Sequence, residues 1–243
     1  MVLFLTGSPT RYEEPSFTED NGFLADVRAA LARASGGLPP KVLLVSAAPD
    51  DEGFTESVRK GMSECMHASG IETASITMLE RRNAAQAPEL VRQSHWIILC
   101  GGHVPTQNRF LHQIGLKALL KDFRGVVMGC SAGSMNCAET VYAAPEEDGE
   151  AVDPEYKRFL TGLGLTKTTI LPHYNYWKDR TLDGLNYINE IILPDSMGRT
   201  FCYITDGSYI LVKDGIEELR GEAYIVHNGK IKQLSANGDS VLL

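Results

Sequence analysis

The segment from residue 125 to residue 135 constrains the fold of this chain more than any other. It reads Gly-Val-Val-Met-Gly-Cys-Ser-Ala-Gly-Ser-Met, an apolar run that enters a tight turn and leaves through residues able to start a helix. Glycine at positions 129 and 133 leaves room for a sharp turn, because neither residue has a Cβ. A strand, a turn and a helix in this order favour a nucleophile elbow with Ser131 at its tip. An ordinary Gly- and Ser-rich turn without chemistry is the alternative interpretation.

Cys130 lies beside Ser131 and is the alternative nucleophile. It occupies the second position of the turn, where the side chain should face the packing between strand and helix. A buried cysteine behaves mostly as a small hydrophobic residue, so we expect Ser131 to carry the reactive group. The N–H of Ala132, in the first turn of the following helix, lacks a helical partner and is a candidate oxyanion donor.

Strand-like and helix-like segments alternate along the first half of the chain. The predicted strands are 2–5, 41–46, 73–79, 95–100 and 125–129, and the predicted helices are 22–33, 51–69, 88–94 and 107–121. This alternation predicts an α/β fold with a mostly parallel sheet and right-handed crossovers. Functional residues of such folds gather at the carboxyl ends of the strands. Both Ser131 and the Gly101–Gly102 pair fall at such ends.

The second half of the chain is less regular. A strand is predicted over 168–171, a helix over 179–191 and a strand over 201–204. The tail alternates apolar runs with Asp-Gly and Asn-Gly turns, which are typical of hairpins. We therefore expect a small antiparallel C-terminal extension, and a single α/β domain over residues 1–243. Residues 9–20 are expected to form a loop, and the acidic segment 144–165 is interpreted as a solvated loop or a lid.

Composition excludes several classes of partner. The net charge of −8 and the pI of about 5.3 argue against binding to nucleic acid or to an anionic membrane. Five cysteines without a Cys-x-x-Cys pair favour free thiols in a reducing compartment. No apolar run approaches the roughly 18 residues of a membrane helix, and no signal peptide is recognisable. We expect a cytoplasmic monomer or homodimer without a cofactor, and no cluster has the ligand spacing of a metal site.

A serine nucleophile needs a base within hydrogen-bond reach and a third group that orients the base. His173 follows a predicted strand and a proline, whereas His67 and His227 are interpreted as surface or structural residues. Asp206 follows the strand over 201–204 and is the expected orienting carboxylate. The remaining carboxylates that could take this role are Asp179, Asp183 and Glu139. Gly102, which lets the backbone approach a substrate closely, would supply the second oxyanion donor beside Ala132.

Four short segments resemble one known family. Leu99-Cys100-Gly101-Gly102-His103, Gly129-Cys130-Ser131-Ala132-Gly133-Ser134, Leu171-Pro172-His173 and Asp206-Gly207-Ser208 come in the order and rough spacing of the serine peptidases typified by peptidase E (aspartyl dipeptidase) and cyanophycinase. The resemblance covers about residues 40–235. It implies a three-layer fold similar to class I glutamine amidotransferase domains, with Ser131 in place of their cysteine.

The resemblance also implies a substrate class, a short peptide, and preference for an N-terminal aspartate in particular. Gly101, His103 and Arg180 are then candidate substrate-binding residues, and Arg109 is a second candidate cation. The chain departs from peptidase E in two places: His103 stands where asparagine is usual, and Asp206 where glutamate is usual. The first departure bears on the substrate, while the second leaves a Ser131–His173–Asp206 triad feasible.

Three hypotheses follow from these residues. The leading one is a serine exopeptidase that cleaves short peptides through an acyl-enzyme. The second is an amidase or esterase that uses the same triad on a small non-peptide substrate. The third is a catalytically silent domain, similar to glutamine amidotransferases, that binds a partner or a metabolite.

Overall fold

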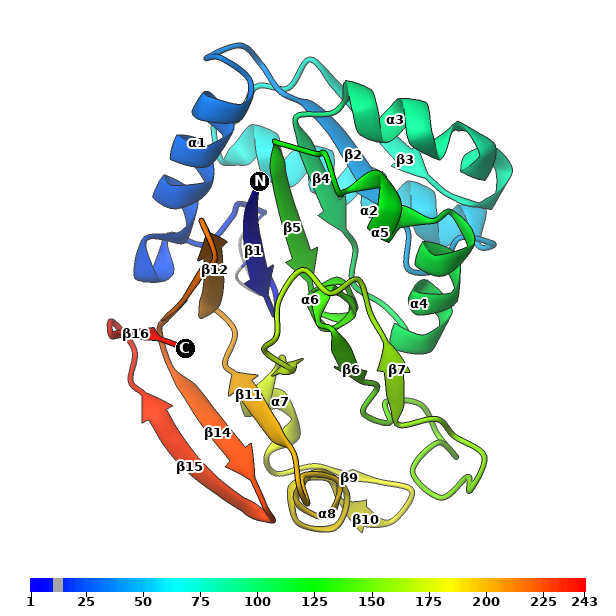
Figure 1. The fold of residues 1–243 in the computed structure, drawn as a ribbon, viewed down its shortest axis with the longest axis vertical. Helices are drawn as coiled ribbons and strands as arrows, with labels where there is room; N and C mark the ends of the chain where they lie inside the picture. The colour runs from blue at the N-terminus through cyan, green and yellow to red at the C-terminus, as the bar shows by residue number, and fades with distance from the viewer. Residues whose placement is uncertain (11–14) are drawn as a thin grey trace.

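The computed structural model describes residues 1–10 and 15–243, and an eight-stranded sheet runs through its centre (Figure 1). The strand order in this main sheet is β16-β13-β12-β1-β5-β4-β2-β3. Its parallel part consists of β1 (Val2–Thr6), β2 (Lys41–Val45), β3 (Ser75–Leu79), β4 (Trp96–Leu99) and β5 (Val126–Cys130). The predicted α/β fold with a mostly parallel sheet is confirmed.

Helices cover both faces of the parallel strands, as a three-layer fold requires. Alternate residues of β1 point to opposite faces of the sheet. Phe4 belongs to the cluster that contains the N-terminal helices, and Leu3 and Leu5 belong to the cluster that contains the helices after β3. One face carries α1 (Phe23–Ala34) and α2 (Glu52–Ala68), and the other carries α3 (Ala87–Gln93), α4 (Val104–Gln113), α5 (Leu116–Leu119) and α6 (Ala132–Cys137). Two 3-10 segments, η1 (Asp20–Gly22) and η2 (Arg81–Gln86), precede α1 and α3.

The single helix predicted over 107–121 is instead two. Gly115, with a left-handed φ of 64°, separates α4 from α5, because a left-handed residue cannot continue a right-handed helix. None of the helices in the described part of the chain is long and apolar enough to span a membrane. The predicted loop over 9–20 includes residues 11–14, which lie outside the described residues.

The C-terminal tail is antiparallel, as predicted, but it divides between two sheets. The strands β12 (Tyr209–Lys213), β13 (Ile216–Arg220) and β16 (Ser240–Leu242) extend the main sheet beyond β1. A second, four-stranded sheet contains β8 (Ile170–Leu171), β11 (Thr200–Ile204), β14 (Ala223–His227) and β15 (Lys230–Ser235), and its longer strands lie below the main sheet in Figure 1. The sequence pattern missed β13 because its only apolar residues are Ile216 and Leu219.

The helix predicted over 179–191 is wrong. This region begins with a short hairpin of β9 (Thr181–Leu182) and β10 (Leu185–Asn186), followed by the π-helical segment η3 (Tyr187–Ile192) and α8 (Leu193–Asp195). Asp183 and Gly184 form the turn with φ values of 53° and 80°, which a right-handed helix excludes. The Leu and Ile residues there recur at helical spacing, so the pattern predicts a helix although the Asp183-Gly184 pair favours a turn.

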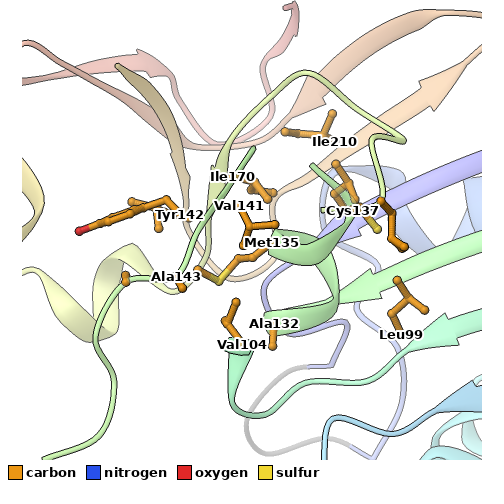
Figure 2. Packing of buried hydrophobic residues seen from close by; sticks show 14 of the residues in the cluster. Leu99, Val104, Ala132, Met135, Cys137, Val141, Tyr142, Ala143, Ile170 and Ile210 are labelled. Carbon is orange, nitrogen blue, oxygen red and sulfur yellow. The ribbon is translucent and has the colours of Figure 1, made fainter. Parts of the chain in front are cut away.

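Packing around α6 joins the two sheets into one core. Figure 2 shows Ala132 and Met135 of α6 packed with Leu99 and Val104, and near Ile170 of the second sheet. The hairpin of β6 (Thr140–Tyr142) and β7 (Phe159–Thr161) adds an aromatic contact, because the ring of Tyr142 stacks on Phe201 of β11 at 4.5 Å. The segment after β8 carries α7 (Tyr174–Trp177). This packing fixes the second sheet against the carboxyl ends of β1 and β5.

Candidate active site

Ser131 occupies a strained turn between β5 and α6. Its φ of 49° and ψ of −112° lie in a region that non-glycine residues rarely adopt and that clusters at functional sites. Both flanking glycines are required by close packing. A Cβ on Gly129 would lie 2.6 Å from the backbone of Ser134, and a Cβ on Gly133 would lie 2.1 Å from the carbonyl oxygen of Leu99. The turn therefore has the geometry of a nucleophile elbow.

The backbone of this elbow is anchored to the end of β1. The N–H of Ser131 donates to the carbonyl oxygens of Thr6 and Gly7, both at 2.9 Å. The hydroxyl of Ser134 donates to the Thr6 carbonyl at 2.7 Å and accepts from the Thr6 N–H at 2.8 Å. The Ser131 N–H is therefore engaged, and the next N–H along the chain is that of Ala132 in the first turn of α6, where N–H groups have no helical partner.

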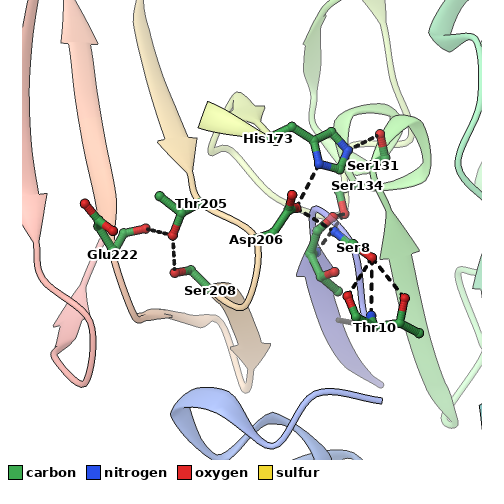
Figure 3. Close-up of polar contacts among 10 residues, drawn as sticks. Ser8, Thr10, Ser131, Ser134, His173, Thr205, Asp206, Ser208 and Glu222 are labelled. Atoms are coloured by element: carbon green, nitrogen blue, oxygen red, sulfur yellow. Dashed lines mark hydrogen bonds and ion pairs between the residues drawn. The ribbon is translucent and has the colours of Figure 1, made fainter. Parts of the chain in front are cut away.

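The Ser131 hydroxyl is the end of a hydrogen-bonded row of three side chains, shown in Figure 3. Its Oγ lies 2.9 Å from Nε2 of His173, and Nδ1 of His173 lies 2.8 Å from Oδ1 of Asp206. The same carboxylate oxygen accepts the backbone N–H of Ser8 at 3.0 Å. With Nδ1–H donating to Asp206, Nε2 is free to accept the serine proton, so this row can activate the hydroxyl.

The three side chains come from two sheets rather than from the single rim that the sequence suggested. Ser131 follows β5 of the main sheet, while His173 and Asp206 follow β8 and β11 of the second sheet. The strands β8 and β11 are parallel and pair through Ile170 and Cys202, so their carboxyl ends lie together. His173 has a left-handed backbone, with a φ of 62°, which turns its ring toward the elbow.

Gly7 and Ser8 are site residues that sequence reasoning missed. A Cβ on Gly7 would lie 2.3 Å from Oδ1 of Asp206 and 3.4 Å from the His173 ring. Any larger residue at position 7 would therefore displace the carboxylate. A signal was present in the sequence, because Gly7 follows the predicted strand 2–5 just as Gly101 and Ser131 follow theirs, and carboxyl ends of parallel strands meet.

Electrostatics distinguish Asp206 from the buried thiol beside Ser131. Burial raises the pKa of Asp206, but the hydrogen bond and charge of His173 and the Ser8 N–H lower it more, so the pKa lies below its ordinary value. Asp206 is thus ionised at neutral pH, although its side chain is 46% exposed. Burial raises the pKa of Cys130 well above its ordinary value, which keeps this thiol protonated and a poor nucleophile.

The other candidate carboxylates have different surroundings. Asp183 accepts the backbone N–H groups of Gly149 and Ala151 at 2.7 and 2.9 Å. Asp179 and Glu139 are exposed. Asp206 is therefore the carboxylate that the structure places on the His173 ring.

The cleft beside Ser131 has a volume of about 530 Å³, and Gly101 and His173 line it. Gly101 lies close to the elbow, since a Cβ on it would be 3.4 Å from the Cβ of Ser131. Gly102 follows with a φ of 144°, and a Cβ there would lie 2.8 Å from Ala47. Gly102 therefore has a backbone conformation and a contact that favour glycine, and Gly101 is the residue of this turn that lies beside Ser131.

Three expected substrate-binding side chains point elsewhere. His103 uses Nδ1 for the Thr106 hydroxyl and Nε2 for Glu150, each at 2.8 Å. Arg180 is exposed and lies 3.8 Å above the ring of Tyr176. Arg109 is likewise engaged, with the Thr106 hydroxyl at 3.4 Å. None of the three is among the described residues that line the cleft.

Several hydrogen bonds hold the acidic segment between β6 and β7 in place. Glu150 accepts the N–H groups of Glu146 and Glu147 at 2.8 and 3.1 Å while it binds His103. His103, Glu147 and Glu150 bring possible metal-ligand atoms within 4.8 Å of one another. The Glu150 carboxylate already has three protein partners there, the His103 ring and the N–H groups of Glu146 and Glu147. We therefore interpret the three side chains as contacts that hold the segment between β6 and β7 in place.

Glu146 is a second residue that the sequence did not reveal. Burial raises its pKa to about 7; the carboxylates of Glu150 and Glu147 add to this effect, and the charge of His173 opposes it. Glu146 thus lies within electrostatic reach of the His173 ring. The acidic run around it reads as a solvated surface, because burial of one member depends on tertiary contacts.

Comparisons with known proteins identify the family of the chain. The model of peptidase family S51 matches residues 15–219, which is most of the chain. The chain belongs to peptidase family S51. It is therefore a serine peptidase, and the resemblance to the peptidase E group is confirmed. A comparison with curated protein sequences gives no significant match.

Two solved structures are similar to this S51 peptidase in fold. A peptidase from an acI-B1 actinobacterium has a TM-score of 0.65 and 19% identity, over 100% of this chain and 96% of its own. A putative peptidase E protein from Listeria monocytogenes EGD-e has a TM-score of 0.54 and 17% identity, over 96% of this chain and 98% of its own. Both structural alignments cover nearly the whole chain and so include the second sheet as well as the main sheet.

Proposed function

We propose that this S51 peptidase is an exopeptidase that hydrolyses short peptides through an acyl-enzyme on Ser131. His173 takes the hydroxyl proton as Ser131 attacks the carbonyl carbon, and returns it to the leaving amine. Asp206 keeps the His173 ring in the tautomer that can accept this proton. Water then attacks the acyl-enzyme with His173 as base, which releases the acid and restores the hydroxyl. The observation that carries the proposal is the row of hydrogen bonds at 2.9 and 2.8 Å.

Two backbone N–H groups would stabilise the oxyanion in this scheme. Ala132 offers the first free donor after Ser131, whose own N–H is bonded to the β1 carbonyls. Gly102 offers the second, from the turn that packs against Ala47. Preorganised donors of this kind contribute a large part of the rate enhancement in acyl transfer. The volume of the cleft, about 530 Å³, suits a short peptide.

A preference for N-terminal aspartate, which the resemblance implied, would need a cation at the cleft. Arg180 was expected to supply it, but its guanidinium lies on Tyr176. Dipeptides, their N-acetylated forms and p-nitrophenyl esters separate the possible activities. An exopeptidase cleaves free dipeptides faster than acetylated ones, whereas an esterase or amidase cleaves only the non-peptide substrates.

The direct test is peptide hydrolysis by Ser131→Ala and His173→Ala. Each variant should lose about 10⁴- to 10⁶-fold in kcat, because the two residues act as a unit. Cys130→Ala should lose less than about 10-fold, because a protonated thiol is not the nucleophile. Circular dichroism of each variant checks the fold. Full peptidase activity in folded Ser131→Ala would refute the proposal.

A further inference from the structure

One wall of the cleft is an apolar face of helix α2. The described residues that line the cleft come from α2, from the ends of β4 and β5, and from the segments after β1 and β8. Those of α2 are Val58, Gly61, Met62, Glu64 and Cys65. Pro9 and Pro15 lie among the lining residues after β1. Among these described lining residues, the ionisable side chains other than thiols are those of Glu64 and His173.

The apolar stripe of α2 is longer than the core requires. Phe54, Val58, Met62, Cys65 and Met66 recur at helical spacing, and such a stripe normally packs inward. Only Cys65 and Met66 are fully buried, at 4% and 1% exposure, whereas Phe54 is 36% exposed. Val58 and Met62 are half-buried and line the cleft. The stripe therefore continues out of the core and along the reactive serine.

The stripe also reaches the proposed oxyanion turn. A Cβ on Gly102 would lie 3.7 Å from Cζ of Phe54, so the ring lies against this turn. A substrate held at Gly102 and Ser131 would contact α2 with a side chain adjacent to the scissile bond. Burial of that side chain would cover apolar surface that is otherwise exposed to water, which favours an apolar group.

The floor of the cleft is uncharged as well. Cys65, Cys100 and Cys130 line it, and burial raises the pKa of Cys65 and of Cys100 to about 12. Protonated buried thiols behave as small hydrophobic groups. Glu64 lies at an exposed position 4.0 Å from Lys60. No lysine or arginine is among the described residues that line the cleft, so a substrate carboxylate would lose water there without a lining cation to replace it, which is unfavourable.

We propose, on the basis of the function proposed above, that the α2 wall binds an uncharged apolar side chain next to the scissile bond. The substrates are then short hydrophobic peptides rather than acidic ones. Val58 and Met62 provide the contact surface. This assignment separates the specificity of this chain from the aspartate preference of peptidase E.

The first test compares kcat/KM for two dipeptide series, X-Leu and Leu-X, with Leu, Met, Ala, Asp and Lys at position X. In at least one series, Leu and Met should exceed Asp by about 10-fold or more, and exceed Ala by a similar factor, since hydrophobic pockets discriminate by 10- to 200-fold per group. A preference for Asp in either series, or equal rates in both, would overturn the assignment.

A matched pair of variants locates the effect on α2. Met62→Arg puts a cation into the cleft and should shift the Leu-to-Asp ratio toward Asp by about 10-fold. Ser57→Arg adds the same charge to an exposed position of α2 outside the cleft, and should leave the ratio unchanged. If the two variants change the ratio equally, the long-range charge and not the α2 wall controls specificity, and the assignment is wrong.

Binding to Ser131→Ala keeps this test separate from catalysis. Calorimetric titration should give a Kd for Leu-Leu or Met-Leu at least about 10-fold lower than for Asp-Leu. If Leu-Leu or Met-Leu binds more tightly than Asp-Leu in this way but the wild type cleaves no peptide, the apolar wall is supported and the peptidase scheme is refuted. Tighter binding of Asp-Leu, or no binding of any dipeptide, would refute the apolar wall whatever the activity of the wild type.

Discussion

The two halves of the site are built in different ways. Ser131 and Gly102 come from the parallel part of the main sheet, which helices cover on both faces and which leaves Ala132 fully buried. His173 and Asp206 come from a second sheet whose contributing strand β8 has only two residues, and their side chains are 24% and 46% exposed. The nucleophile half is thus part of a rigid core, whereas the base half is attached to its edge.

This difference indicates where the proposed chemistry is most vulnerable. Alignment of the row depends on how the second sheet docks on β1 and β5. The end of β1 makes this junction, because the Ser8 N–H binds Asp206 and the Gly7 carbonyl binds the Ser131 N–H. Changes at the junction should therefore reduce catalysis more than they reduce stability.

The largest effect expected in the base half is that of Asp206→Asn. The amide cannot hold the His173 tautomer in which Nε2 accepts the serine proton, so kcat/KM should fall by about 10³- to 10⁴-fold. Asp179→Asn, at an exposed position near the same histidine in sequence, is the control and should stay within about 2-fold. A loss of less than 10-fold in Asp206→Asn would assign the orienting role to another group.

The same variant has an expected pH signature. Because the folded pKa of Asp206 lies below its ordinary value, the ionised carboxylate stabilises the folded state above the unfolded pKa of about 3.9. This contribution disappears as the pH falls through the lower folded pKa. The difference in unfolding free energy between wild type and Asp206→Asn should thus shrink as the pH falls below 4. Urea unfolding across this range measures it.

The next effect is that of Gly7→Ala at the junction. Since the new Cβ would lie 2.3 Å from Oδ1 of Asp206, the carboxylate or the end of β1 must move. A displacement of about 1 Å in such a row costs about 10²-fold in kcat. Gly53→Ala, whose new Cβ would have an ordinary 3.5 Å contact with Asp51, should change kcat by less than about 2-fold. Equal kinetics for the two variants would mean that the junction does not align the row.

The smallest effect concerns stability near the base half. Glu146 has a folded pKa of about 7, above the ordinary value of about 4.3. Its favourable contribution to folding is complete below pH 4 and is lost as the pH rises through 7. Glu146→Gln should therefore be more stable than wild type by on the order of 2 kcal/mol at pH 8, and by much less at pH 5.

Urea unfolding of Glu146→Gln at both pH values measures this difference. Glu147→Gln, at an exposed neighbouring position, is the control and should show a smaller change, because an exposed carboxylate keeps its hydration. If Glu146→Gln shows no gain at pH 8, the Glu146 carboxylate is solvated and does not act on His173.

The sequence predicted the nucleophile half better than the base half for physical reasons. Buried parallel strands are continuous apolar runs, and their crossover helices have a clear period, so β1 to β5 were recognisable. The region after β6 contains strands of two and three residues and the left-handed turn at Asp183. Its structure depends on tertiary packing that a local pattern does not encode.

The same distinction applies to single site residues. Ser131, His173 and Asp206 were recognisable because each follows a predicted strand. The surroundings of Glu146 and His103 were not, because they depend on distant partners: His103 binds Glu150, which is 47 residues away in sequence. Local spacing indicates which residues reach the rim of a sheet, but not which way their side chains turn there.

The most direct test of the proposed chemistry is labelling of the folded protein with a fluorophosphonate, followed by mass spectrometry of its peptides. The scheme predicts a covalent adduct on Ser131 in the wild type, and labelling slower by about 10³-fold or more in His173→Ala, since the hydroxyl then has no base. Rapid labelling of Ser131 without His173, or labelling of the adjacent Cys130 instead, would contradict the account.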